Sequence, residues 1–223
     1  MKITNQSQPI SHHPFDPFIP EGAEKLIIGT IPPQKFCVEP KMLGGDDVDF
    51  YYGSKRNHFW KIMDEITGAD LPFKNTPQAV EARKSLLRKL GTGITDMVAS
   101  CIHRDASALD QALDEIQYKD LVGLLEQHPQ ITTLIYTSEF VKSLVYKCYK
   151  KDHTKHPDAP DNDKRRRVHL NGRWYDVWIL YSPSPRGLAG LGEGGRQDRL
   201  KQYQKVFGKN ESTREMGEGV RRV

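Results

Sequence analysis

The sequence has few cysteines, no long apolar run and only a small excess of charge, and each shortage excludes a class of protein. Its 223 residues include three scattered cysteines, Cys37, Cys101 and Cys148. An odd, dispersed set does not build a disulfide framework and cannot supply a four-thiolate zinc or iron–sulfur site. No apolar run reaches about 18 residues, so no transmembrane helix is expected. The N-terminal segment also lacks the apolar stretch of a signal peptide, and we therefore expect a cytoplasmic protein.

Motifs for metal ions, nucleotides and nucleophilic hydrolysis are missing as well. No Gly-Lys-Ser/Thr sequence follows a predicted strand, and no Gly-x-Ser-x-Gly elbow is present. The histidine pairs His12–His13 and His153–His156 lack the helix and acidic partner of a zinc-protease motif. The acidic loop 44–49 is of a kind that is commonly solvated. We expect neither a metal ion nor another cofactor.

The composition is that of a globular domain with a mildly basic surface. Hydrophobic residues make up 37% and charged residues 28%, and 33 Lys and Arg exceed 29 Asp and Glu to give a net charge of +4. This length suits one α/β domain. The charge permits contact with a polyanion without requiring it, because nucleic-acid binding depends on a local patch. One dense basic run, Lys164–Arg167, is expected in a solvated loop.

Short apolar runs alternate with amphipathic segments along the chain. The apolar runs predict strands at 24–30, 93–100, 131–137 and in a hairpin around Asn171–Gly172, whereas 3.6-residue periodicity predicts helices at 57–66, 77–90, 105–116, 119–129, 138–151 and 196–208. The segments 31–52 and 152–167 are expected to be loops. This alternation predicts a three-layer α/β/α sandwich with a short, mainly parallel central sheet. We expect an irregular N-terminal arm at 1–22, one domain at 23–207 and a flexible tail at 208–223.

Ligands of parallel sheets bind at the carboxyl ends of the strands, so the segments that follow the strands are the candidate site. The first strand leads into GTIPP and the second into the region 96–100. The third is followed by Ser138–Glu139 and the last by SPSPRG at 182–187. GSKRNHFW at 53–60 begins the helix after the first loop and can lie near the same edge.

Taken in order, GTIPP, GSKRNHFW, GITDMV and SPSPRG resemble the motifs of the uracil-DNA glycosylase superfamily over residues 12–207. GSKRNHFW and GITDMV are similar to the mismatch-specific and thymine-DNA glycosylase branch. YYGSKRNHFW, with a first loop that lacks Asn, is similar to the hypoxanthine-DNA glycosylase branch. The resemblance implies an enzyme of base-excision repair. We expect it to be monofunctional, because no Schiff-base lysine is evident, and monomeric, because one flipped nucleotide needs one pocket. Such an enzyme flips a deaminated or mismatched base, here uracil or hypoxanthine, out of DNA and hydrolyses its N-glycosidic bond through an oxocarbenium-like state.

The water that attacks the sugar needs a polar residue to hold it. The family's first loop places Asn or Asp at the third position of Gly-x-Asn-Pro-Gly, where this sequence has Ile31. The hypoxanthine-type pattern implies Asn57 instead, whose carboxamide can orient a water. The competing interpretation is that Asn57 only caps a helix. Asp96 is the other candidate, either as a base for the water or as a cap of a turn.

The remaining site residues follow from the same resemblance. The base pocket is expected to include Gly29, Thr30, Ile31, Pro32, Phe36, Tyr51, Tyr52 and Gly53, with the aromatic rings either stacking on the base or forming core. DNA contacts are expected from Arg56, His58, Ser182, Pro183, Ser184, Pro185 and Arg186, of which Arg186 would approach the gap left by the base. Solvated helix residues and a rigid proline turn are the alternatives for these two segments.

A different function also fits the departures from the family pattern. Ser182 stands where many relatives have a His that donates to the base, and Ile31 cannot hold water. Both departures favour a catalytically silent protein of the same fold that binds nucleic acid or a nucleotide-like ligand. Asn57 in its aromatic setting favours the enzyme.

Overall fold

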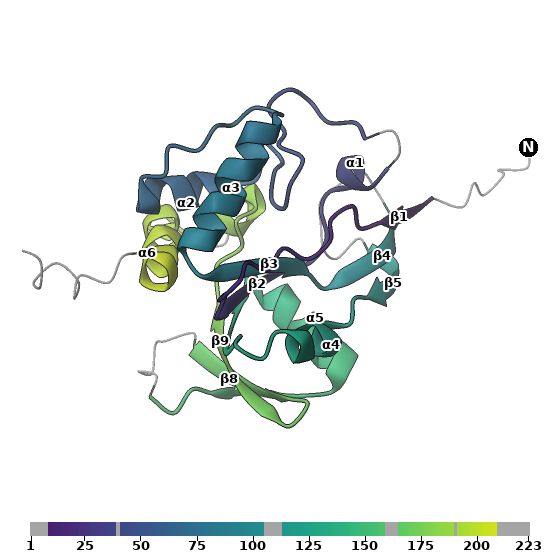
Figure 1. The fold of residues 1–223 in the computed structure, drawn as a ribbon, viewed down its shortest axis with the longest axis vertical. Coiled ribbons are helices and arrows are strands. Elements are labelled where there is room, and N and C mark those ends of the chain that lie inside the picture. The colour runs from purple at the N-terminus through teal and green to yellow at the C-terminus, as the bar shows by residue number, and fades with distance from the viewer. Residues whose placement is uncertain (1–8, 39–40, 105–112, 159–164, 190, 209–223) are drawn as a thin grey trace, which may run out of the picture.

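The computed structural model describes residues 9–38, 41–104, 113–158, 165–189 and 191–208 (Figure 1). Its main sheet has six strands in the order β3-β2-β6-β9-β8-β7. The strands are β2 (Lys25–Gly29), β3 (Thr92–Asp96), β6 (Thr133–Tyr136), β7 (His153–Lys155), β8 (Arg165–Leu170) and β9 (Arg173–Ile179). Strands β3, β2, β6 and β9 are mutually parallel. At the edge next to β9, β8 and β7 add two antiparallel strands. The sheet is therefore mainly parallel, as the sequence predicts.

Helices cover both faces of this sheet. Three of them, α2 (Phe59–Thr67), α3 (Pro77–Lys89) and α6 (Gly195–Phe207), pack on one face, and α4 (Leu121–Gln127) and α5 (Glu139–Tyr149) pack on the other (Figure 1). The predicted three-layer α/β/α fold is confirmed. A short helix, α1 (Gln34–Cys37), and a 3-10 turn, η2 (Pro185–Leu188), lie in loops.

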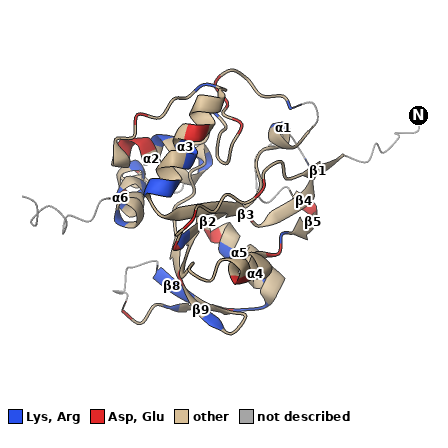
Figure 2. Cartoon of the chain, in the orientation of Figure 1, with Lys and Arg blue, Asp and Glu red and all other residues tan. Residues whose placement is uncertain are grey.

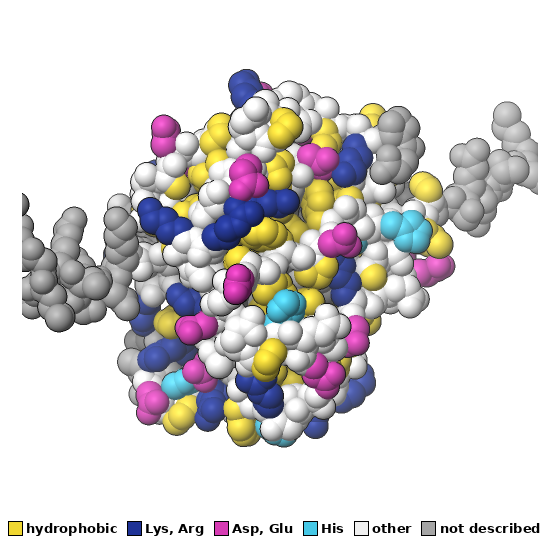
Figure 3. Space-filling view, in the orientation of Figure 1, with side chains coloured by type: hydrophobic (Ala, Val, Ile, Leu, Met, Phe, Trp, Pro, Cys, Tyr) yellow, Lys and Arg dark blue, Asp and Glu magenta, His cyan; other side chains and the backbone are white. Residues whose placement is uncertain are grey.

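Basic and acidic residues are distributed over all layers of the molecule (Figure 2). On the face seen in space-filling view, side chains of both signs are intermixed with apolar ones (Figure 3). That face therefore has no large field of one sign, and contact with a polyanion there would depend on local groups.

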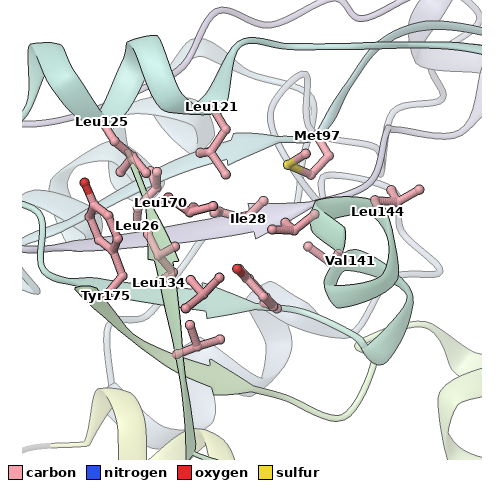
Figure 4. Packing of buried hydrophobic residues seen from close by; sticks show 14 of the residues in the cluster. Leu26, Ile28, Met97, Leu121, Leu125, Leu134, Val141, Leu144, Leu170 and Tyr175 are labelled. Atoms are coloured by element: carbon pink, nitrogen blue, oxygen red, sulfur yellow. The ribbon is translucent and has the colours of Figure 1, made fainter. Parts of the chain in front are cut away.

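The core divides into two clusters because side chains alternate along each strand. Leu26 and Ile28 of β2 point toward α4 and α5, where they meet Leu121, Leu125, Val141 and Leu144 (Figure 4). Ile27, between them in sequence, points to the opposite face and packs with α2, α3 and α6. Strands buried on both faces read as continuous apolar runs, which is why KLIIG is recognisable in the sequence.

A second, antiparallel sheet was not predicted. It consists of β1 (Ile10–His12), β4 (Val98–His103) and β5 (Leu113–Tyr118), in the order β1-β4-β5. β1 lies within the N-terminal segment that we expected to be irregular. The predicted helix over 105–116 is wrong for 113–116, which belong to β5, and residues 105–112 lie outside the described part. Ile116 and Tyr118 alternate toward the core, so pairing with β4 outweighs the helical pattern upstream.

Three other boundaries differ from the predictions. The expected strand 93–100 is two strands, because the chain leaves the main sheet at Met97 and continues as β4. The expected loop 152–167 contains β7, and the basic run Arg165–Arg167 forms the start of β8 rather than part of a loop.

The hairpin is confirmed: Asn171 and Gly172 have φ of 45° and 75°, as a tight turn between twisted strands requires. Among the described residues, no helix is long and apolar enough to cross a bilayer.

Candidate active site

The carboxyl ends of β2, β3 and β6 meet around Gly29. Gly29 is in register with Asp96, and the preceding residue, Ile28, is in register with Tyr136. A Cβ on Gly29 would overlap the Tyr52 hydroxyl and the Asp96 Oδ1, so both oxygens lie against its backbone. Position 29 therefore has room only for glycine while Tyr52 and Asp96 keep these places.

Tyr52 crosses the carboxyl edge of the sheet. Its hydroxyl lies 2.8 Å from Thr137 Oγ1, just beyond the end of β6, and its ring stacks on Phe59 with centroids 4.6 Å apart. Thr137 Oγ1 in turn donates to the carbonyl of Ile28 at 3.3 Å. The partly exposed Tyr52 thus joins two strand ends to the start of α2.

Asp96 is held in a buried network. It is 5% exposed, and its Oδ2 lies 2.8 Å from His13 Nε2. Three groups lie within hydrogen-bond distance of His13 Nδ1: the Phe15 carbonyl at 2.9 Å, the Phe15 N–H at 3.1 Å and the Lys119 ammonium at 3.0 Å. The Nε2 atom of His13 is thus placed to donate a hydrogen bond to the Asp96 carboxylate. Burial lowers the pKa of Lys119, and the nearby Asp96 opposes that shift.

A cavity of about 170 Å³ adjoins this network. It is lined by Pro17, Thr95, Asp96, Lys119, Asp120, Leu121 and Leu124. The volume is enough for several water molecules, and the lining carries the polar groups that ordered water needs. Sequence reasoning missed His13 and Lys119 as partners of Asp96, because only the fold brings the N-terminal strand and the end of β5 to the end of β3.

Asn57 lies one residue before His58, the N-cap of α2, which itself makes no side-chain cap hydrogen bond. The Asn57 Oδ1 accepts a hydrogen bond of 2.9 Å from the Phe59 N–H, while the Asn57 N–H donates to the Ser54 carbonyl at 2.8 Å. A carboxamide has two acceptor sites and two donor hydrogens, so one of four is used by the helix start. The half-buried Asn57 keeps capacity for a water, and its catalytic role stays a prediction.

The segment Arg56–His58 lies against residues Ser182–Gly187, which we call the Ser/Pro loop. The His58 N–H donates to the Pro183 carbonyl at 2.9 Å. Arg199 of α6, only 3% exposed, donates to His58 Nδ1 at 2.8 Å and to the Ser182 and Ser184 carbonyls at 3.0 and 3.3 Å. Burial and the Arg199 guanidinium lower the pKa of His58. The structure thus brings two of the four predicted segments together, through an arginine that sequence reasoning missed.

The Ser/Pro loop is held by its own hydroxyls. Ser184 Oγ accepts from the Gly187 N–H at 3.1 Å and begins η2, and Ser182 Oγ donates to Ser184 Oγ at 3.2 Å. Pro183 is buried, whereas Pro185, Arg186 and the neighbouring Arg56 are exposed. The loop is a fixed turn that presents Arg186 to solvent.

The predicted pocket residues differ in how accessible they are. Phe36 and Tyr51 are 1% and 0% exposed, and the Tyr51 hydroxyl donates to the Asp16 carbonyl at 3.0 Å. Stacking of either ring on a base would therefore require the protein to open, whereas Tyr52 is already partly exposed. Thr30, Pro32 and Gly53 are buried, and Ile31 packs against the apolar cluster under α4 and α5. These pocket assignments stay predictions.

Within the described residues, no group of three or more His, Cys, Asp or Glu side chains is arranged to hold a metal ion. Cys37 and Cys101 are unsuited to nucleophilic chemistry. Burial raises the pKa of Cys37 to about 12 and that of Cys101 to about 11, so both thiols stay protonated at neutral pH.

Comparison with known proteins gives a likeness of fold. The sequence matches no protein-family model and no curated protein sequence. A similar solved structure is the solution NMR structure of a Methanosarcina acetivorans protein, provisionally named a uracil DNA glycosylase. The TM-score is 0.55 at 16% identity, and the match covers 89% of this chain and 99% of the other. The chain therefore has an overall fold like that of this protein.

Proposed function

We propose that this protein is a monofunctional DNA glycosylase that removes a deaminated base, uracil or hypoxanthine, in base-excision repair. The observation that carries the proposal is the hydrogen bond from the His58 N–H to the Pro183 carbonyl. It joins the two glycosylase-like segments GSKRNHFW and SPSPRG at the carboxyl edge of a sheet. The fold likeness to a protein named for this activity supports the same assignment.

Hydrolysis of an N-glycosidic bond needs a positioned water and an environment that tolerates a sugar cation. We assign the positioning of the attacking water to Asn57. Its carboxamide can orient the water without deprotonating it. That is sufficient when the oxocarbenium character develops before attack. Asp96 is the other candidate for holding the water: it is a buried carboxyl group 2.8 Å from His13 Nε2, and a carboxylate there would stabilise a nearby cation.

The DNA would be held at the same edge. Ser182–Pro185 form a fixed turn that can press on the phosphates around the flipped nucleotide, and the exposed Arg186 at its tip would enter the gap left by the base. Tyr52 offers the partly exposed ring for stacking. No step requires a cofactor.

Single-turnover excision tests the assignment. Duplex oligonucleotides carrying uracil, hypoxanthine or a G·T mismatch are incubated with excess protein, and alkali cleaves any abasic product. We expect excision of uracil or hypoxanthine by the natural protein and a loss of about 10²–10⁴-fold in Asn57→Ala, with duplex binding retained. Asn75→Ala, at an exposed asparagine, is the matched control.

The same series separates Asn57 from Asp96. A larger loss of excision rate in Asp96→Asn than in Asn57→Ala, at equal thermal stability, would indicate that Asp96 rather than Asn57 positions the water. If the loss of excision in Asn57→Ala were fully explained by a smaller folded fraction, Asn57 would serve only to hold the start of α2 through its hydrogen bond with the Phe59 N–H.

A second function is favoured by one observation. The Oδ1 of Asn57 is engaged by the Phe59 N–H, which a purely structural asparagine also explains. A protein of this fold that binds nucleic acid or a nucleotide-like ligand without cutting it would retain duplex binding and excise none of the three lesions.

A further inference from the structure

The β8–β9 hairpin carries a row of basic and aromatic side chains on the sheet face toward α6. Val168, Leu170, Tyr175 and Val177 point into the core under α4 and α5. Because side chains alternate along a strand, the intervening residues point to the opposite face. They form the cross-strand pairs Arg165–Trp178, Arg167–Asp176 and His169–Trp174.

Cations lie over both tryptophan rings of this row. The Arg165 guanidinium lies 5.5 Å and the Lys205 ammonium 5.4 Å from the Trp178 ring centroid. The Arg167 guanidinium lies 5.0 Å from the centroid of Trp174. Trp174 is 50% exposed, so an aromatic surface in contact with an arginine remains accessible to a ligand.

A hollow of about 300 Å³ adjoins Trp178. It is lined by Lys25, Thr133, Trp178, Lys205, Val206 and Gly208, where the C-terminus of α6 passes over the start of β2 and β6. Its volume is at the lower end of the range for small-ligand sites, which is about 300–1,000 Å³. We call Lys25, Arg165, Arg167, Trp174, Trp178 and Lys205 the basic aromatic face.

The charge of this face is predominantly positive. β8 and β9 contain one carboxylate, Asp176, which lies 3.3 Å from Arg167 Nε and 3.3 Å from His156 Nε2. It offsets part of the charge of Arg167. Lys25, Arg165 and Lys205 add further positive charge beside the tryptophans.

We propose that the basic aromatic face binds single-stranded DNA. A single strand presents phosphates at regular intervals and bases with open π-faces, which match interleaved arginines and tryptophans. A duplex hides the faces of its bases and would leave Trp174 without a stacking partner. The planar guanidinium groups suit both phosphate contact and stacking.

The face begins near the candidate active site and extends away from it. Arg165 and Trp178 lie near the carboxyl end of β9, while His169 and Trp174 lie toward the hairpin turn, so the row runs away from the site edge. The proposal does not depend on glycosylase activity, and its ligand contains no base to be removed.

The test uses a dye-labelled oligothymidylate without any damaged base. Its anisotropy gives the dissociation constant, and quenching of tryptophan fluorescence reports contact with a ring. The third tryptophan, Trp60, is 2% exposed and is shielded from the ligand. We expect quenching in the natural protein, and about tenfold weaker binding in Trp174→Ala and in Arg167→Ala.

The matched control is Arg166→Ala. Arg166 precedes Arg167 in β8, carries the same charge and points to the opposite face. Arg167→Ala should also reduce the slope of log K against log salt by about 0.7, while Arg166→Ala leaves it unchanged. Absence of quenching by oligothymidylate, or equal weakening by the Arg166 and Arg167 substitutions, would overturn the proposal. Thermal melts of each variant confirm that the fold is intact.

Discussion

Arg199 is the residue on which the geometry of the candidate site depends most directly. Its guanidinium is buried and donates to His58 and to two carbonyls of the Ser/Pro loop. In the sequence it is one of several charged residues of a closing helix, RQDRLKQYQKVF, and has no pattern that predicts burial. Its role follows from tertiary packing alone.

Replacement of Arg199 by Met should destabilise the protein by roughly 2–4 kcal/mol, because the Ser182 and Ser184 carbonyls and His58 Nδ1 lose their donors. Urea denaturation measures the change. Arg196→Met, at an exposed position one turn earlier with an ion pair of 3.2 Å to Glu65, is the control and should cost less than about 1 kcal/mol. Similar values for the two variants would contradict the role given to Arg199.

His153 makes the stability depend on pH. Burial, followed by the charge of Lys142, lowers its pKa to about 4, and its Nε2 lies 3.1 Å from the Tyr136 hydroxyl. Since the unfolded chain binds a proton near pH 6.5 and the folded one does not, the contribution of neutral His153 is complete above about pH 6.5. It is lost progressively as the pH falls from there toward 4.

We therefore expect unfolding at pH 5 to be easier than at pH 7, with about 2 kcal/mol of the difference due to His153. His153→Gln removes the titrating group and should reduce the difference by that amount. The lowered pKa of His58 acts in the same direction in both proteins and cancels in this comparison. An unchanged pH dependence in the variant would contradict the burial argument.

Among the secondary-structure elements, the sequence predicts those whose signals lie within the element itself. Pro77 at the start of α3, the Asn171–Gly172 turn and the apolar runs of β2 and β6 are visible in the sequence, because caps, turns and buried strands have short-range signatures. β5 and the second sheet are not visible, because a half-exposed strand depends on its partner. The His13–Asp96 contact is hidden for the same reason, since it joins residues that only the fold brings together.

Gly29→Ala tests how the strand ends are packed. The added methyl group would collide with the Tyr52 hydroxyl and Asp96 Oδ1, so the side chains must shift. We expect a loss of about 1–3 kcal/mol in stability and a larger proportional loss of excision, because both displaced groups belong to the candidate site. Gly45→Ala adds a methyl group with nothing within 4 Å and should change neither quantity. If Gly29→Ala excised the base at the rate of the natural protein, Tyr52 and Asp96 would have no role in catalysis.

For the whole molecule, the sequence predicts the fold more securely than the chemistry of the candidate site. Strand and helix alternation specifies three layers, and the rule for parallel sheets then selects the carboxyl edge. The burial of Phe36 and Tyr51, the hydrogen bond from the Phe59 N–H to Asn57 and the network around Asp96 depend on side-chain packing. Composition and motif spacing contain too little information to specify them.

We propose that this molecule hydrolyses the bond between a damaged base and its sugar. The most direct test is to identify the product: duplex DNA with one uracil or one hypoxanthine is incubated with the protein, and the small-molecule fraction is analysed by mass spectrometry. We expect release of the intact free base in equal amount to abasic sites, and loss of this release in the double variant Asn57→Ala, Asp96→Asn. Absence of free base with both duplexes, under conditions in which the protein binds them, would contradict the proposal.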